Sequence, residues 1–285
     1  MSFDNAYEAI TEENDSRWAF GTGFDDPLSG VDTSVPSGVD GARLAAYCLM
    51  LGDDALVFSH RLQEWCTNAP ELEDEVAIAN IALDLLGQAR LLLSRAGKAD
   101  GSGRGEDALA YFRGEQEFRN VRFTELDGGH FGHLIARLVI FSAWRLALLQ
   151  RLVASEDPVL AAIADKGVKE VTYHRDYAAQ WAVRLGDGTE LSHRRMQEGF
   201  DAAWPYVDEL FQPHPDELVD ASSVREEFDA VLDQVFAAAT LARPERAAYA
   251  GVSGHTGRDG VHTEAMGYLL AELQSVARAH PDATW

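Results

Sequence analysis

Four long apolar segments with helical periodicity, arranged as two hairpins, are the feature that most constrains the fold of this chain. The first hairpin joins residues 40–66 to residues 71–96 through the short turn TNAP. The second joins residues 130–154 to residues 158–185 through SEDP, whose proline suits the first turn of the next helix. Strand-like alternation is hard to find after residue 39. The sequence therefore predicts an all-α protein with a ferritin-like four-helix bundle.

The rest of the chain adds an N-terminal extension and further helices to this bundle. Residues 1–38 carry an excess of acids and turn-forming residues without a sustained helical period, so we interpret them as an acidic, flexible extension. Residues 39–285 are predicted to form a single ferritin-like helical domain. Beyond the two hairpins, helices are expected at residues 190–211 (with a kink at Pro205), 223–242 and 262–279.

Charge and composition exclude several classes of function. The 285 residues include 24 Lys and Arg against 47 Asp and Glu, which gives a formal net charge of −23. Phosphate backbones and anionic lipid surfaces repel such a chain, which argues against nucleic-acid and membrane-surface binding. Its uncharged apolar stretches are too short to span a bilayer, and its N-terminus is acidic where a signal peptide would be basic. We therefore expect a cytoplasmic protein.

A ferritin-like bundle raises the question of a di-iron centre. The usual ligands are one carboxylate from each of two helices and a Glu-x-x-His motif from each of the other two. If residues equidistant from a turn lie level, Asp54 faces Asp84 in the first hairpin. The position where Glu-x-x-His would place its histidine is Gly87, which has no side chain that could bind a metal.

The second hairpin fits a metal site less well. Residues 128–155 contain no Asp or Glu, and the Glu-x-x-His position reads Glu170 followed by Tyr173. His174 comes one residue later, and equal spacing from the turn puts Arg137 level with it. A guanidinium opposes a bound dication, so we expect Arg137, together with His174, to neutralise Asp84 and Glu170 in place of metal.

These residues therefore mark a vestigial metal site, and the sequence assigns no catalytic, cofactor-binding or metal-binding residue to this chain. The opposing interpretation is that the carboxylates face solvent and that the acid and histidine of the second hairpin form a plain surface pair. The vestigial positions are Asp54, Asp84, Gly87, Arg137, Glu170, Tyr173 and His174.

Three stretches of the sequence closely resemble one known family. They are LGDDALVFSHRLQEWCTNAPELEDEVAIANIALDLLGQARLLL, EVTYHRDYAAQWAVRLGDGTELSHRRMQEGFDAAWPYVDELF and GVHTEAMGYLLAEL. They resemble the C subunits of the bacterial phenylacetyl-CoA ring epoxidase, the monooxygenase of phenylacetate catabolism. The likeness runs from about residue 43 to Trp285, and the acidic residues 1–38 depart from it.

The resemblance implies a ferritin-like subunit without a di-iron centre of its own. Members of the family pair with a homologous catalytic A subunit, which holds the two irons and binds phenylacetyl-CoA. A reductase with FAD and an iron–sulfur cluster supplies electrons from NADPH, and the complex converts the aromatic ring to a 1,2-epoxide. The implied role is structural, in a hetero-oligomer that contacts the A subunit directly and the reductase indirectly.

Two other functions stay open on the sequence. An active di-iron oxygenase would use the same carboxylates and His174, with His130 or His133 supplying the ligand that the acid-free helix lacks. A CoA- or nucleotide-binding module would use the glycine-rich loop at residues 251–260. That loop lacks the strand–loop–helix context and the Lys-Ser/Thr pair of a phosphate-binding loop.

Overall fold

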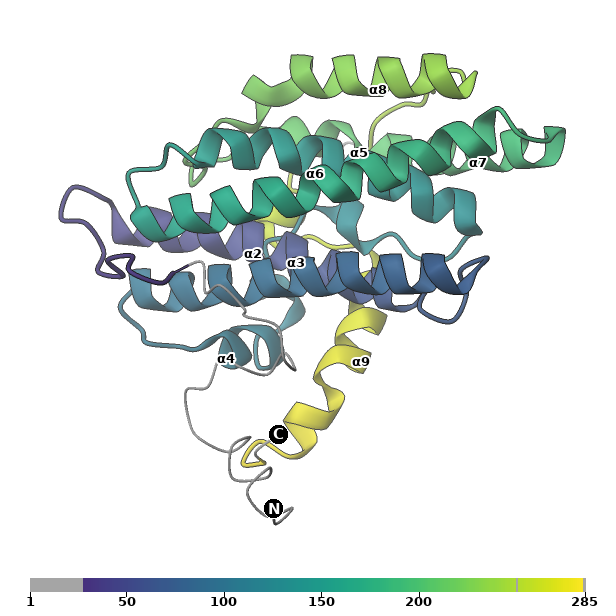
Figure 1. Cartoon of the computed structure of the whole chain (residues 1–285). Helices are drawn as coiled ribbons and strands as arrows, with labels where there is room; N and C mark the ends of the chain where they lie inside the picture. The colour runs from purple at the N-terminus through teal and green to yellow at the C-terminus, as the bar shows by residue number, and fades with distance from the viewer. Residues whose placement is uncertain (1–27, 250, 284–285) are drawn as a thin grey trace, which may run out of the picture.

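The computed structural model describes residues 28–249 and 251–283, and within them it is built from helices and loops (Figure 1). The predicted all-α, ferritin-like class is confirmed. The long helices are α2 (Gly41–Gln63), α3 (Leu72–Ala99), α5 (Phe131–Leu152) and α6 (Pro158–Gly186). The shorter helices are α4 (Glu106–Tyr111), α7 (Glu190–Ala203), α8 (Arg225–Ala239) and α9 (Glu264–Ala279), with 3-10 turns at η1 (Glu115–Glu117), η2 (Arg122–Glu125), η3 (Trp204–Tyr206), η4 (Asp208–Phe211), η5 (Ala221–Val224) and η6 (Gly257–Asp259).

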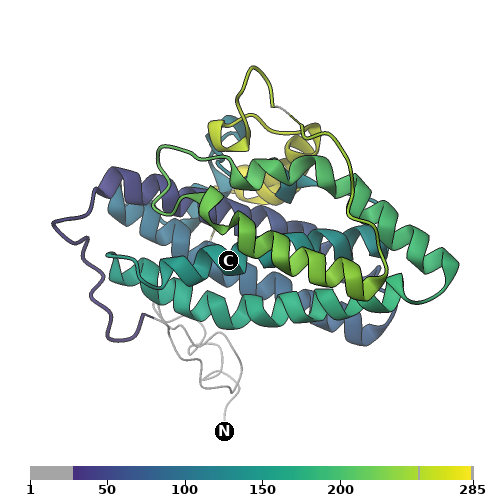
Figure 2. The ribbon, with the colours of Figure 1, turned by 90° about the horizontal axis from the view of Figure 1, so that it is seen from above.

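The two hairpins, α2–α3 and α5–α6, pack on each other and form the bundle. Helix α7 packs against α5 and α6, and α8 covers the same side of the bundle, running along its long helices when seen from above (Figure 2). On the other side, α4 packs against α3, while α9 descends at a steep angle and contacts α2 and α4 (Figure 1).

Helix α5 is the core helix, and α3 is only half covered. Both are long and apolar enough to cross a membrane by length and composition alone, when the charged residues within each helix are counted as part of the stretch. The most apolar window of α5 is 94% buried within the protein, as expected for a core helix. The corresponding window of α3 is 44% buried, so much of its apolar surface faces outward.

Two helix ends differ from the predicted ones. Helix α3 is predicted to end at about residue 96, closed by Gly97, but continues to Ala99. Gly97 lies inside the helix, where a β-carbon would overlap the carbonyl oxygen of Arg104 in the following loop. The helix predicted to run to residue 211 with a kink at Pro205 instead ends at Ala203, and a 3-10 turn follows.

Residues 1–38 are the predicted extension, and its first 27 residues lie outside the described part of the chain. Residues 28–38 pack against the bundle, and several of their apolar side chains are partly buried there. Arg95 of α3 holds them in place, donating to the carbonyls of Thr33 (2.7 Å) and Ser34 (3.2 Å). The composition of this stretch concealed the contact, because the groups that bind Arg95 are backbone carbonyls.

Arg95 also forms a buried ion pair that joins α3 to α6. Its guanidinium binds both carboxylate oxygens of Asp157, with Nε 3.2 Å from Oδ1, and each side chain is 1% exposed. Asp157 is at the same time the N-cap of α6, where Oδ1 accepts from the Leu160 N–H at 2.8 Å. One carboxylate therefore stabilises a helix end, a buried cation and, through that cation, the N-terminal segment.

We predict that Asp157→Ala lowers the free energy of unfolding by about 3–5 kcal/mol, because it removes the cap and leaves Arg95 buried without its counter-charge. Urea denaturation followed by circular dichroism measures the change. The matched control is Asp165→Ala on α6, whose pair with Lys169 is largely exposed (59% and 74%). It should change stability by less than about 1 kcal/mol, and equal effects of the two variants would contradict the role of Asp157.

Candidate functional site

An arginine occupies the centre of the four-helix bundle. Arg145 of α5 is fully buried, and its Nε donates to Oε1 of Gln88 on α3 at 2.9 Å. Its Nη1 donates to the carbonyl of Leu51 on α2 at 3.2 Å. Burial lowers the pKa of Arg145 to about 10, and the Asp54 carboxylate acts in the opposite direction. The guanidinium therefore remains charged at neutral pH.

Gln88 relays this interaction to the fourth helix. While its Oε1 accepts from Arg145, its Nε2 donates to Oε2 of Glu170 on α6 at 2.9 Å. Lys166, one turn earlier on α6, lies 3.3 Å from the other oxygen of Glu170. Burial raises the pKa of Glu170, and the hydrogen bond from Gln88 opposes that shift. A chain of polar groups thus crosses the bundle where ferritin-like proteins place metal ligands.

Asp84 and His174 form a separate pair between α3 and α6. The Nε2 of His174 lies 2.9 Å from Oδ2 of Asp84, the histidine is buried and the carboxylate is 38% exposed. The structure thus pairs His174 with Asp84, one of the carboxylates that the sequence predicted it to neutralise. Tyr173, the residue at the Glu-x-x-His position, is 56% exposed and lies at the surface.

The prediction that Arg137 neutralises Asp84 and Glu170 is wrong. Arg137 donates to the carbonyls of Leu126 and Gly128, the latter at 3.1 Å, and so holds the loop that precedes α5.

The register of the α5–α6 hairpin explains the error. A β-carbon on Gly167 would lie 2.9 Å from the side chain of Leu149, whereas equal spacing from the turn would place Gly167 opposite Trp144. The helices are therefore offset along their axes, and Arg145 rather than Arg137 lies near Glu170. The signal that could have identified Arg145 is a single arginine inside the apolar run FSAWRLALL.

The prediction that Asp54 faces Asp84 is wrong. Its two carboxylate oxygens accept from Arg258 at 3.1 and 2.8 Å, and Oδ1 also accepts from the Val121 N–H at 2.9 Å. Burial raises the pKa of Asp54, and Arg258 opposes that shift. The neighbouring carboxylate of Asp53 is bound in the same way by a buried arginine of the loop after α4. Both acids anchor loops to α2, and Asp54 also acts electrostatically on Arg145 without a direct contact.

Gly87, predicted as the position of a missing ligand, lies at the surface and not in the bundle centre. A β-carbon there would meet no atom within 4 Å, because the residue lines a surface pocket between α3 and α4. The two histidines considered as substitute ligands lie at the N-terminal end of α5, where His130 and His133 contact each other at 3.3 Å. His130 also lies 3.4 Å from the exposed Glu198 of α7.

The glycine-rich loop at residues 251–260 packs tightly against the η1–η2 region. A β-carbon on Gly257 would overlap the carbonyl of Asn120, and one on Gly260 would overlap that of Gln116. Gly260 also has a φ of 79°, which glycine adopts most easily. The glycine spacing therefore serves the close approach of two backbones, which supports a structural interpretation of this loop.

The residues at the bundle centre do not fit a di-iron centre. Across residues 28–249 and 251–283, no three His, Cys, Asp or Glu side chains lie close enough together to hold a metal ion. The central layer offers one carboxylate (Glu170), one amide (Gln88) and a guanidinium. A dication placed there would be repelled by Arg145 and would have to displace hydrogen bonds from each of these groups.

Two comparisons with known proteins match almost the whole chain. The family described as "Phenylacetic acid catabolic protein" matches residues 32–285. The C subunit of the 1,2-phenylacetyl-CoA epoxidase of Escherichia coli (strain K12) is 42% identical over 251 residues, which cover 85% of this chain and 99% of that relative.

Two glycines of α3 are predicted to respond in opposite directions to the same substitution. Gly87→Ala should stabilise the protein by about 0.5–1 kcal/mol, because the new methyl enters open space and the unfolded chain loses freedom. Gly97→Ala should destabilise it by about 1–3 kcal/mol, because the methyl overlaps the Arg104 carbonyl. Thermal and urea unfolding measure both, and a destabilising Gly87→Ala would contradict the open environment.

The raised pKa of Glu170 predicts a specific pH dependence. The folded chain holds this proton more tightly than the unfolded chain, so the wild type loses stability as pH rises from the ordinary carboxyl pKa through the raised one. The side chain that Glu170→Gln introduces cannot ionise. The free energy of unfolding of Glu170→Gln minus that of the wild type should therefore rise with pH between the ordinary carboxyl pKa and the raised pKa of Glu170. Above the raised pKa this difference should level off. Urea titrations at a series of pH values test this, and a difference that falls with pH would contradict it.

Proposed function

The chain belongs to the phenylacetic acid catabolic protein family, and we propose that it is the metal-free structural subunit of a multicomponent epoxidase. The relative that supports this assignment is the C subunit of a 1,2-phenylacetyl-CoA epoxidase, and it aligns over nearly its full length. On this proposal the complex converts the ring of phenylacetyl-CoA to a 1,2-epoxide in phenylacetate catabolism.

The observation that carries the metal-free role is the polar chain Arg145–Gln88–Glu170. A buried guanidinium is expensive to desolvate and is retained only when its hydrogen bonds are largely met. Here an amide accepts from Nε and a backbone carbonyl accepts from Nη1, while Nη2 has no acceptor among the described residues, and the amide is in turn held by a carboxylate. The network uses the polar groups of the central layer to hold the four helices together.

The proposed partner is a homologous catalytic subunit that holds the di-iron centre and binds the CoA thioester. This chain would restrain the partner's helices by packing against them, for which a rigid body such as the one around α5 is suited. A reductase with FAD and an iron–sulfur cluster would supply electrons to the catalytic subunit and contact this chain only indirectly. The assembly would act in the cytoplasm.

The rival function, a di-iron oxygenase in its own right, would require the central layer to rearrange. Arg145 would have to leave the bundle centre, and Asp54 would have to exchange Arg258 for iron. No contact among the described residues favours that rearrangement. Iron analysis separates the two functions directly.

We predict that the chain, expressed alone in iron-replete medium, contains close to no iron per chain and remains folded. Elemental analysis of the purified protein measures the metal, and the catalytic subunit prepared in parallel is the positive control. Arg145→Met removes the guanidinium that opposes a metal ion, but it supplies no metal ligand. The iron content of this variant should therefore equal that of the wild type. Stoichiometric iron in the wild type, approaching two per chain, would overturn the metal-free role.

Co-expression tests the structural role independently. The catalytic subunit should co-purify with this chain as a hetero-oligomer and should lose solubility or turnover when expressed without it. A catalytic subunit that is fully soluble and active alone would contradict the proposal.

A further inference from the structure

The outward face of α3 exposes a row of large apolar side chains. Leu72, Val76 and Leu83 are 70%, 53% and 49% exposed, and their spacing of four and seven residues places them on one side of the helix. Isolated exposed apolar residues are common on soluble proteins, whereas a row along one helix marks an interaction site. The same helix is the one whose most apolar window is only 44% buried.

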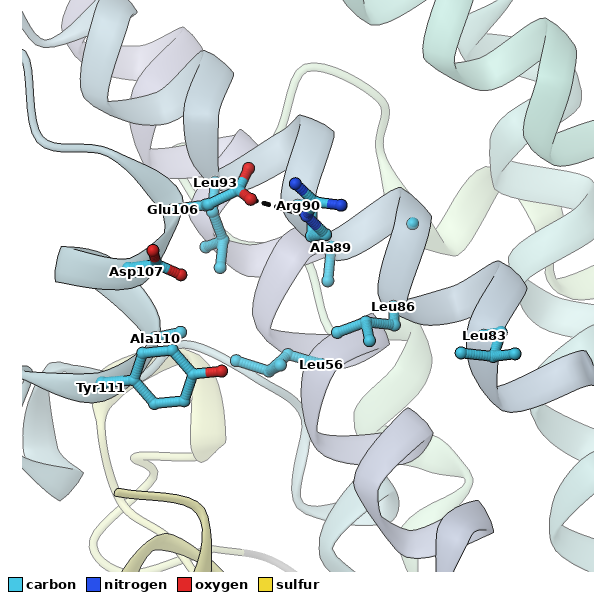
Figure 3. A pocket seen from close by; sticks show the side chains of 11 residues that line it. Leu56, Leu83, Leu86, Ala89, Arg90, Leu93, Glu106, Asp107, Ala110 and Tyr111 are labelled. Atoms are coloured by element: carbon cyan, nitrogen blue, oxygen red, sulfur yellow. Dashed lines mark hydrogen bonds and ion pairs between the residues drawn. The ribbon is translucent and has the colours of Figure 1, made fainter. Parts of the chain in front are cut away.

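A pocket of about 340 Å³ continues this row toward α4. Figure 3 shows Leu56, Leu86 and Tyr111 around the hollow, with Leu83 at the α3 side. At its rim Arg90 pairs with Glu106 at 2.6 Å. A pocket lined by apolar side chains beside an exposed apolar row suits a large side chain inserted from a partner.

We propose that this α3 face, meaning Leu72, Val76, Leu83 and the adjoining pocket, binds the catalytic subunit through an apolar helix flanked by lysines and arginines. The proposal rests on the proposed function and identifies the surface that performs it. The apolar row would pack against the partner's helix, and the pocket would receive one of its large apolar side chains.

Charge complementarity identifies the partner as basic. By helical periodicity, acidic residues flank the α3 face on both sides, and the exposed cation at the pocket, Arg90, is already paired with Glu106. A second copy of this chain would bring another net charge of −23 and the same acidic border against the first. Lysines and arginines around an apolar centre would instead gain attraction at this border. The acidic residues are Glu71, Glu73, Glu75 and Asp107, together with Asp84 and Glu106, which already contact His174 and Arg90.

The test compares two valines of matched exposure in full-length chains co-expressed with the catalytic subunit. Val76→Asp and Leu83→Asp should weaken the complex by at least about tenfold, because each buries a charge in an apolar contact. Val276→Asp on α9, where the valine is 55% exposed, should bind like the wild type. Affinity is measured by titration of purified subunits, and circular dichroism of each variant alone confirms that it folds.

A pocket-filling variant tests the site without adding charge. Gly87→Trp should fold, because a side chain there meets no atom of this chain within 4 Å of its β-carbon, yet it should block the hollow and weaken the complex. Asp107→Lys should weaken binding through its altered charge, and added NaCl should weaken the wild-type complex.

The outcomes that would count against the proposal are distinguishable. If the wild type does not bind the catalytic subunit, the proposed function fails. If it binds but Val76→Asp, Leu83→Asp and Gly87→Trp bind as tightly as Val276→Asp, the function stands and the α3 face is overturned as its site. A homodimer of this chain alone that Val76→Asp dissociates would overturn the assignment of the occupant.

Discussion

The charge of Arg145 in the bundle centre is the constraint on which the rest of the structure depends. A guanidinium removed from water needs acceptors, and Arg145 has two, Gln88 and the Leu51 carbonyl, while its Nη2 has none and no carboxylate contacts it directly among the described residues. Gln88 therefore has to face inward with its oxygen toward Arg145, and its nitrogen then requires an acceptor, which is Glu170. These successive hydrogen bonds are consistent with the orientation of α3 and α6 around α5. Because Gln88 and Arg145 occupy the central layer, Glu170 is the carboxylate that this hydrogen-bonded chain contains.

Buried arginines also connect the bundle to the segments around it. Arg95 joins α3 to α6 through Asp157, and Arg258 joins the loop before α9 to Asp54 of α2. In both pairs the guanidinium engages both oxygens of a buried carboxylate and donates to backbone carbonyls as well. The planar, multi-donor arginine head can meet several acceptors at once, which lysine cannot do in the same geometry. The prevalence of arginine over lysine in this chain is consistent with that structural use.

Helix α3 links the interior to the proposed interface. Its inner side carries Gln88 and Arg95, which hold the bundle together, while its outer side carries the exposed row that includes Val76 and Leu83. A helix fixed from within by buried hydrogen bonds offers a preorganised outer face, and preorganisation lowers the entropy lost on association. The hydrogen bonds that cross the bundle centre therefore also stiffen the surface that we assign to the partner.

The sequence by itself determined the all-α class, the two hairpins, most helix ends and the broken ligand pattern, because these depend on local periodicity, capping residues and residue identity. It could also show that α5 carries no acid. Only the tertiary structure decided which arginine lies at the centre, where Asp54 finds its counter-charge and which way Gly87 faces. Those outcomes depend on the offset between packed helices and on contacts with loops far away in the chain. Distance from a turn does not determine that offset, because interlocking side chains set it.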